Sequence, residues 1–358
     1  MKKARLIALG VLFVGLLVAV LIKVAGSDPH YLGKSARAWA LDLNSPDPKL
    51  RAQAVTSLQK MGSTAVPSLV SMLNTTNKSL SDKTFFIVVP RLPPKTRRSM
   101  YESHFPVGPV IKRTLAIRAL ETIGPDAHAA IPALHKALAD KENLVSSRAA
   151  QALGKIGKES VPILLPDLHN SDPVFRRQII YALGLVGADA QEAVPALIEQ
   201  LDDPDALVRT TTIDALSKIG AAATPVLVEA LHDKNAAKRQ SAAKAIATIH
   251  LKNGKVSEAL IEVLQDSEPA VRRQAAESLG ILSPGLPSVV TALIHALQDQ
   301  NSEVRLEAIR GLGRAGKRAE SASPALKESL KDPDESVRAA ALAALTKITN
   351  TTSSTSPP

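Results

Sequence analysis

The fold is decided by the stretch Asp205-Ala-Leu-Val-Arg209-Thr-Thr-Thr-Ile-Asp-Ala-Leu216-Ser-Lys-Ile219-Gly220. Its apolar and small residues Val208, Thr212, Ala215, Leu216 and Ile219 recur with the period of one face of an α-helix. An acidic residue suits the start of such a helix, and a glycine suits its end. The stretch therefore predicts one amphipathic helix that begins after Asp205 and ends before Gly220.

The same pattern recurs in nine units along the 358-residue chain. From Arg113 onward the aligned position recurs at spacings of 33, 30, 33, 30, 33, 33 and 33 residues, and the first spacing is 62. In seven of the eight units whose aligned residue is arginine, an acidic or amide residue lies four positions before it. The aligned residues are Arg51, Arg113, Ser146, Arg176, Arg209, Arg239, Arg272, Arg305 and Arg338, and the preceding caps are Asp47, Asp172, Asp205, Asn235, Glu268, Asn301 and Asp334.

Each unit also contains another apolar segment, which forms its first helix, precedes the arginine-bearing second helix, and begins near a proline such as Pro195 or Pro225. Proline is tolerated in the first turn of a helix, so each unit is predicted to hold two helices. Only 3% of the residues are aromatic, and the apolar residues are mostly Ala, Leu, Val and Ile, which suits close-packed helices. Because repeats add length without a second core, the pattern predicts an all-α solenoid of about nine helix pairs over residues 27–349.

The D-x-x-x-R pattern followed by A-x-x-A-L-x-x-I-G resembles HEAT repeats of the short bacterial type, which are also known from phycobilisome lyases. The resemblance covers about residues 31–349. It implies a right-handed α-solenoid in which acidic and arginine side chains form a ladder between neighbouring repeats. The N-terminal region also resembles that of membrane-anchored bacterial HEAT proteins.

The N-terminal residues predict a membrane segment. Residues 6–22 are an apolar run preceded by Lys2, Lys3 and Arg5, and 17 to 19 such residues span roughly 26–28 Å as a helix. The basic flank predicts a single-pass anchor over residues 1–26 with the repeats on the extracytoplasmic, periplasmic side. The alternative is a cleaved signal peptide and a secreted protein. Residues 350–358 are predicted to be a disordered tail.

An insert at about residues 75–110 interrupts the repeat spacing. It is predicted to be a degenerate repeat, with a helix over about 78–89, a proline-containing loop, and a longer helix from about Val107. The alternative is a basic patch around Lys95, Arg97 and Arg98 that contacts anionic lipid headgroups.

No catalytic or metal-binding motif stands out in the sequence. The chain has no cysteine, and its eight histidines form no H-x-x-x-H pair, so neither a metal nor another cofactor is predicted. Gly33-Lys34-Ser35 lacks the preceding strand and the first glycine of a phosphate-binding loop. Ser35 is instead predicted to cap a helix that holds Ala36, Ala38, Trp39 and Leu43.

The regular arginines are predicted to be structural. Each one follows a carboxylate or amide by one helical turn, so a pair within that turn explains both residues better than binding to a phosphate polymer does. The net charge of +10 also lies toward the N-terminus, because residues 114–358 carry 27 basic and 29 acidic side chains. This distribution argues against duplex DNA as the ligand.

The remaining candidates for binding lie on the exposed face of the second helix of each unit, which is concave in the family. Mixed charges, amides and one tyrosine on this face favour a protein ligand. The sequence therefore predicts a non-enzymatic, monomeric protein-binding scaffold, with a lyase-like or chaperone-like accessory protein and a DNA-binding protein as alternatives. The predicted binding residues are Arg118, Arg148, Gln151, Lys155, Arg177, Gln178, Tyr181, Lys218, Arg273, Gln274, Arg310 and Arg314.

Overall fold

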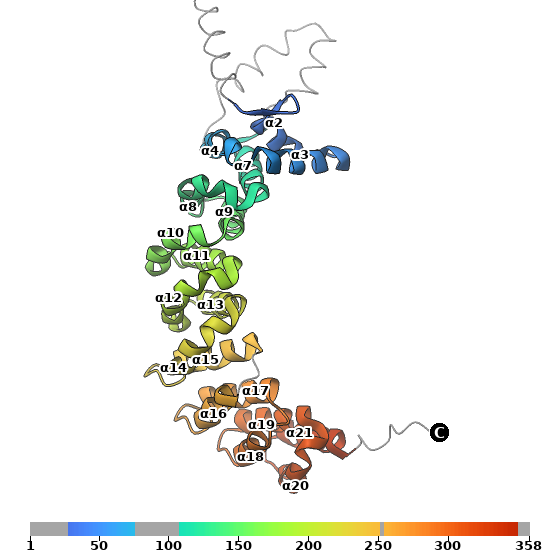
Figure 1. Cartoon of the computed structure of the whole chain (residues 1–358). Coiled ribbons are helices and arrows are strands. Elements are labelled where there is room, and N and C mark those ends of the chain that lie inside the picture. The colour runs from blue at the N-terminus through green and yellow to red at the C-terminus, as the bar shows by residue number, and fades with distance from the viewer. Residues whose placement is uncertain (1–27, 76–106, 251–253, 350–358) are drawn as a thin grey trace, which may run out of the picture. The chain divides into compact units, whose positions relative to one another are not determined.

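A computed structural model describes residues 28–75, 107–250 and 254–349 (Figure 1). The chain forms two compact units, Met1–Leu164 and Leu165–Pro358. The described residues of both units are mainly pairs of α-helices joined by short turns. The predicted anchor over residues 1–26, the insert's helix at 78–89 with its basic cluster, and the tail at 350–358 lie outside the described residues.

The first unit opens with a two-stranded antiparallel hairpin, which the sequence did not predict. Its strands pair His30 with Ser35 and Tyr31 with Lys34. The helix that follows begins as predicted, because the Ser35 hydroxyl accepts a hydrogen bond from the Ala38 amide. The described elements are β1 (His30–Tyr31), β2 (Lys34–Ser35), α2 (Ala36–Asp42), α3 (Pro48–Met61), α4 (Val66–Leu73), α7 (Pro109–Ile123), α8 (Ile131–Ala137), α9 (Asn143–Ile156) and α10 (Val161–Leu164).

The second unit contains six long helices that each carry a repeat arginine. In sequence order each of these helices packs against the next, and the shorter helices lie along one side of the row (Figure 1). The long helices are α11 (Pro173–Val186), α13 (Ala206–Ile219), α15 (Ala236–Ile249), α17 (Pro269–Leu282), α19 (Ser302–Ala315) and α21 (Glu335–Thr349). The short helices are α12 (Val194–Glu199), α14 (Thr224–Ala230), α16 (Gly254–Val263), α18 (Pro287–Ala296) and α20 (Ser323–Ser329).

The helix boundaries follow the predicted caps. The Asp205 carboxylate accepts from the amides of Leu207 and Val208, which have no partner inside the helix. At the other end Gly220 has φ +80° and ψ −137°, a conformation that a side chain disfavours. The equivalent of Gly220 in α15 is His250, which adopts a left-handed φ of 58°.

Small residues bring neighbouring long helices into close contact. A Cβ added to Gly280 of α17 would lie 2.7 Å from the Cα of Gly311 in α19. Gly184 of α11 makes a similarly close contact, because an added Cβ would lie 2.9 Å from the Cα of Ala215 in α13. Alanine and glycine are therefore required at these seams, which explains the alanine-rich composition of the repeats.

The prediction of a single-pass membrane location is wrong on the evidence of the described helices. In the three described ranges, no helix is long and apolar enough to cross a membrane. The longest have 15 residues, about 22 Å at 1.5 Å per residue, against a hydrocarbon core of about 30 Å. Residues 6–22, on which the prediction was based, lie outside the described part of the chain.

Candidate functional site: the exposed face of the second helices

A typical repeat arginine, such as Arg272, makes hydrogen bonds with two separate turns of the chain. Arg272 of α17 donates from Nε and Nη2 to the two carboxylate oxygens of Asp299, at 2.7 and 2.8 Å. Its Nη1 donates to the carbonyl oxygens of Asp266 and Ser267, at 2.8 and 3.1 Å, in the turn before α17. Because Asp299 lies in the turn before α19, this arginine joins two consecutive repeats by a bidentate, charge-assisted contact.

The same contact recurs, and we call each example a rung. In every rung the carboxylate lies 27 residues after its arginine, in the turn that precedes the next long helix. The sequence interpretation paired each arginine with the acidic or amide residue one turn before it. Six of these residues instead accept hydrogen bonds from the first amides of their own helix, and Glu268 makes no such bond: the six are Asp47, Asp172, Asp205, Asn235, Asn301 and Asp334. The rungs are Arg113–Asp140, Arg176–Asp203, Arg239–Asp266, Arg272–Asp299 and Arg305–Asp332.

Two other ladder arginines, Arg51 and Arg209, bind only backbone carbonyls among the described residues. Arg209 donates to the carbonyl oxygens of Asp203 and Pro204 at 2.6 and 3.1 Å. The next repeat begins after only 30 residues, because the 3-10 segment Gly220–Ala223 has four residues where Gly187–Ala193 has seven. Asp233 is the carboxylate expected to pair with Arg209. The shorter turn shifts it, and it instead lies 3.5 Å from the Lys238 ammonium. Arg338, the last in the series, likewise donates to two carbonyls of its own turn.

Three of the rungs, those of Arg239, Arg272 and Arg305, lower the pKa of their carboxylates. For Asp332, hydrogen bonds from Arg305 are the main reason that its pKa lies below the ordinary value. For Asp266 and Asp299, burial alone would raise the pKa, but hydrogen bonds from the arginine and from a backbone amide lower it. Hydrogen bonding to Asp332 likewise raises the pKa of Arg305. These arginines are therefore permanently charged and already occupied, so they are not free to bind a ligand.

The positions one, five and nine residues after the aligned residue form a half-buried to exposed face, which we call the variable face. Nine of the twelve predicted binding residues occupy it: Arg118, Gln151, Lys155, Arg177, Tyr181, Lys218, Arg273, Arg310 and Arg314. The other three, Arg148, Gln178 and Gln274, lie two residues after the aligned position, on the side turned toward a neighbouring helix. Gln274 is only 4% exposed and donates to Glu277 at 3.0 Å, so it contributes to packing rather than to a surface.

Several polar side chains on or beside the variable face form pairs. Lys218 lies 2.7 Å from Asp214, and its ammonium stands 5.4 Å from the ring centroid of Tyr181 on the preceding helix. In the first unit Arg148 donates to Gln151 at 3.0 Å, and in the second unit Arg273 lies 3.5 Å from Glu303. These side chains are held in place by weak, partly exposed pairs that a ligand can replace.

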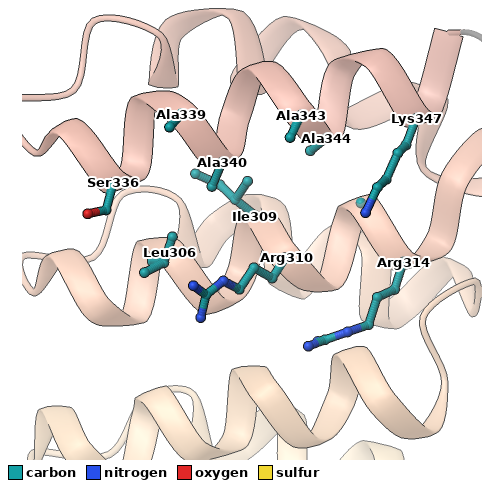
Figure 2. Close-up of a pocket in the computed structure, with 11 residues that line it drawn as sticks. Leu306, Ile309, Arg310, Arg314, Ser336, Ala339, Ala340, Ala343, Ala344 and Lys347 are labelled. Carbon is teal, nitrogen blue, oxygen red and sulfur yellow. The ribbon is translucent and has the colours of Figure 1, made fainter.

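A groove of about 480 Å³ lies between α19 and α21 (Figure 2). Its lining is largely apolar and includes three cations: Lys347 extends from α21 toward α19, and Arg310 and Arg314 extend from α19 (Figure 2). Two predicted binding residues, Arg310 and Arg314, therefore meet here, together with a lysine that the sequence interpretation missed. The groove is lined by Leu306, Ile309, Arg310, Gly313, Arg314, Ser336, Ala339, Ala340, Ala343, Ala344 and Lys347.

The histidines and carboxylates of the described surface do not gather into a metal site. No group of three or more His, Asp or Glu side chains in these ranges is arranged to hold a metal ion. The histidines with a carboxylate neighbour, His169 and His232, lie 3.7 and 4.0 Å from Glu199 and Glu262 and are more than half exposed. Exposed single pairs of this kind provide no preorganised site for proton transfer.

The comparisons with known proteins agree with the repeat architecture. The family described as HEAT repeats matches residues 109–168, 161–247, 224–303 and 290–356. No curated protein matches the sequence.

Three solved structures illustrate the likeness. The CpcE–CpcF complex of phycocyanin lyase from Nostoc sp. PCC7120 is 27% identical over 43% of this chain and 98% of that chain, with a TM-score of 0.39. Kap121p is 15% identical over 90% of this chain and 44% of that chain, with a TM-score of 0.53. An engineered protein is 20% identical over 87% and 98% of the two chains, with a TM-score of 0.36. The likeness to Kap121p concerns the fold alone.

Proposed function

Because the chain belongs to the HEAT-repeat family, we propose that it is a non-enzymatic scaffold that binds a protein partner on the variable face of its long helices. Repeat arrays offer extended surfaces of this kind to their ligands. The ladder arginines are engaged by rungs or by the carbonyls of their own turns. The variable face carries the polar side chains that remain, and these are the groups that can give specificity.

One observation carries the proposal. The ladder position stays arginine throughout the second unit, whereas the residue five positions later changes in nearly every repeat. A side chain needed for stacking is expected to recur with the repeat, because its environment recurs. A position whose side chain differs from repeat to repeat is instead expected where each repeat contacts a different part of an irregular ligand. In the second unit these changing residues are Tyr181, Asp214, Lys244, Glu277, Arg310 and Ala343.

The chemistry of the face favours a protein over a nucleic acid. Acidic residues such as Asp214 and Glu277 interrupt the cations, so phosphates would meet repulsion along the row. Tyr181 is the one aromatic side chain among the predicted binding residues, whereas single-stranded nucleic acids bind through several stacking rings. A tyrosine beside arginines and amides is typical of protein interfaces.

The test is quantitative co-purification with a tagged full-length chain. Proteins that co-purify with the wild type are compared with those retained by Arg177→Glu and by Tyr181→Ala. Lys327→Glu, an exposed charge reversal on the short helix α20, is the control. We expect both variants of the variable face to lose a protein that the control retains. Retention of every protein by both variants would show that the variable face is not the binding surface.

A further inference from the structure

We infer that the groove between α19 and α21 binds an acidic segment of the partner protein, one that carries an apolar side chain between two carboxylates. This inference rests on the proposed function and assigns a ligand chemistry to one part of the variable face. Three features of the groove carry it: its apolar floor, its cations, and the spacing between the two helices.

The floor suits aliphatic side chains. Ile309 is fully buried at its base, and Ala340 and Ala344 of α21 lie beside it (Figure 2). A Cβ added to Gly313 of α19 would lie 3.3 Å from that of Ala344, so small residues keep the two helices close. The apolar side chains that an incoming group can contact are the half-buried Leu306 and Ala340 and the exposed Ala343, which also line the groove.

The rim suits carboxylates. Arg310 is partly neutralised by Glu307, whose carboxylate lies 2.5 Å away. Arg314 is exposed and makes no ion pair or hydrogen bond with the described residues; its Nη1 lies over Gly280 instead. The residue at the same position in α13, Lys218, is already paired with Asp214 at 2.7 Å. A carboxylate that reaches Arg314 therefore displaces no existing acid.

The spacing of the two helices that carry Arg314 and Lys347 sets the approximate spacing of the acids. Arg314 and Lys347 occupy equivalent positions on adjacent helices, which pack about 8–10 Å apart. An extended peptide rises about 3.3 Å per residue, so carboxylates three residues apart span a similar distance. A phosphodiester chain would provide the charge, but it has no aliphatic group for the floor, and no aromatic residue lines the groove to stack a base.

The experiment uses fluorescein-labelled peptides with the core Glu-Leu-Ala-Glu and the matched core Gln-Leu-Ala-Gln. Binding to the full-length chain is measured by fluorescence anisotropy at low and physiological ionic strength. Arg314→Glu tests the rim, and Ala343→Glu introduces a negative charge at the floor without touching a cation. Lys327→Glu has the same charge change as Arg314→Glu, lies on the short helix α20 outside the groove lining, and serves as the control. Circular dichroism and thermal midpoints show whether each variant is folded.

We expect the glutamate peptide to bind at least about tenfold more tightly than the glutamine peptide, since two partly exposed ion pairs are lost. Arg314→Glu and Ala343→Glu should each weaken binding about fivefold or more, while Lys327→Glu leaves it unchanged. Equal binding of both peptides, or full binding by a folded Arg314→Glu, would overturn the inference.

Equally tight binding of a single-stranded oligonucleotide of the same charge at the groove would also overturn it, by showing that charge alone is recognised. If the peptides fail to bind while Arg177→Glu still releases a co-purified protein, the groove inference fails and the proposed function stands. If the peptides fail to bind and the Arg177 and Tyr181 variants also retain every co-purified protein, both the groove inference and the proposed function fail.

Discussion

Replacing Asp299 by asparagine tests whether the rungs hold consecutive repeats together. The carboxylate of Asp299 accepts two hydrogen bonds from Arg272 and one, at 2.8 Å, from the Asn301 amide. Asparagine preserves the shape and one acceptor oxygen, but it places an NH₂ donor against the Arg272 Nε and removes the negative charge. The substitution therefore leaves a largely buried guanidinium without its counter-ion.

The magnitude follows from the burial of the pair. Removing one partner of a fully buried ion pair costs about 3–5 kcal/mol. The side chains of Arg272 and Asp299 are 15% and 11% exposed, and Arg272 keeps its two carbonyl acceptors. We therefore expect a loss of about 2–3 kcal/mol, which corresponds to roughly 30-fold or more in the local opening equilibrium.

Hydrogen exchange followed by mass spectrometry measures this loss where it occurs. Repeat arrays need not unfold in one step, so a local probe is more informative than a single midpoint. Peptides from α17 and α19 should exchange faster in Asp299→Asn, while those from α11 are unchanged. The matched control is Glu328→Gln, whose pair with Lys331 at 3.2 Å is 69% and 76% exposed and is worth under about 1 kcal/mol. Equal protection in Asp299→Asn and Glu328→Gln would refute the structural role of the rung.

Two further predictions concern pH and packing. The folded-state pKa of Asp332 lies below its ordinary value of 3.8, so its contribution to stability is present above about pH 4 and is lost as the pH falls through the folded pKa. Acid titrations of unfolding should therefore be flatter below pH 4 in Asp332→Asn than in the wild type, and identical slopes would contradict the pairing with Arg305. Gly280→Leu should separate α17 from α19 and cost about 3 kcal/mol or more, because its Cβ alone would meet Gly311 at 2.7 Å. Urea unfolding measures that loss, and a wild-type midpoint would show that the helices are not held this close.

Much of the fold was predictable because its signals are local. The cap at Asp205 and the glycine at Gly220 act within one helical turn, and the apolar stripe between them reports one buried face. Ser35 was identified as a cap for the same reason. The hairpin of β1 and β2 was missed because strands of two residues carry no periodic signal.

The rungs were only partly predictable because their partners belong to different repeats. The signal was present: an aspartate six residues before Arg272, Arg305 and Arg338. This aspartate was missed because the capping residue four positions before the arginine is nearer in sequence and was predicted to be its partner. Helical projection identified most of the variable face, but it did not separate Gln274 from Arg273, because one step around the helix changes the side chain from half-buried to buried.

The groove between α19 and α21 could not be predicted from the sequence. Arg310 and Arg314 were identified as exposed residues of one helix, but Lys347 was not joined to them. Their convergence depends on how closely α19 and α21 pack, and the contact of Gly313 with Ala344 determines that distance. Such a contact between helices is a tertiary property that no local pattern reports.

Site-specific photo-crosslinking in living cells tests the proposed scaffold function most directly. A benzophenone amino acid is placed on the variable face, at Tyr181 or Ala343, and on the short helix α20, at Glu328. We predict that the two positions on the variable face crosslink to a discrete protein and that the Glu328 position does not. A crosslink at Glu328 with none at Tyr181 or Ala343 would contradict binding on the variable face.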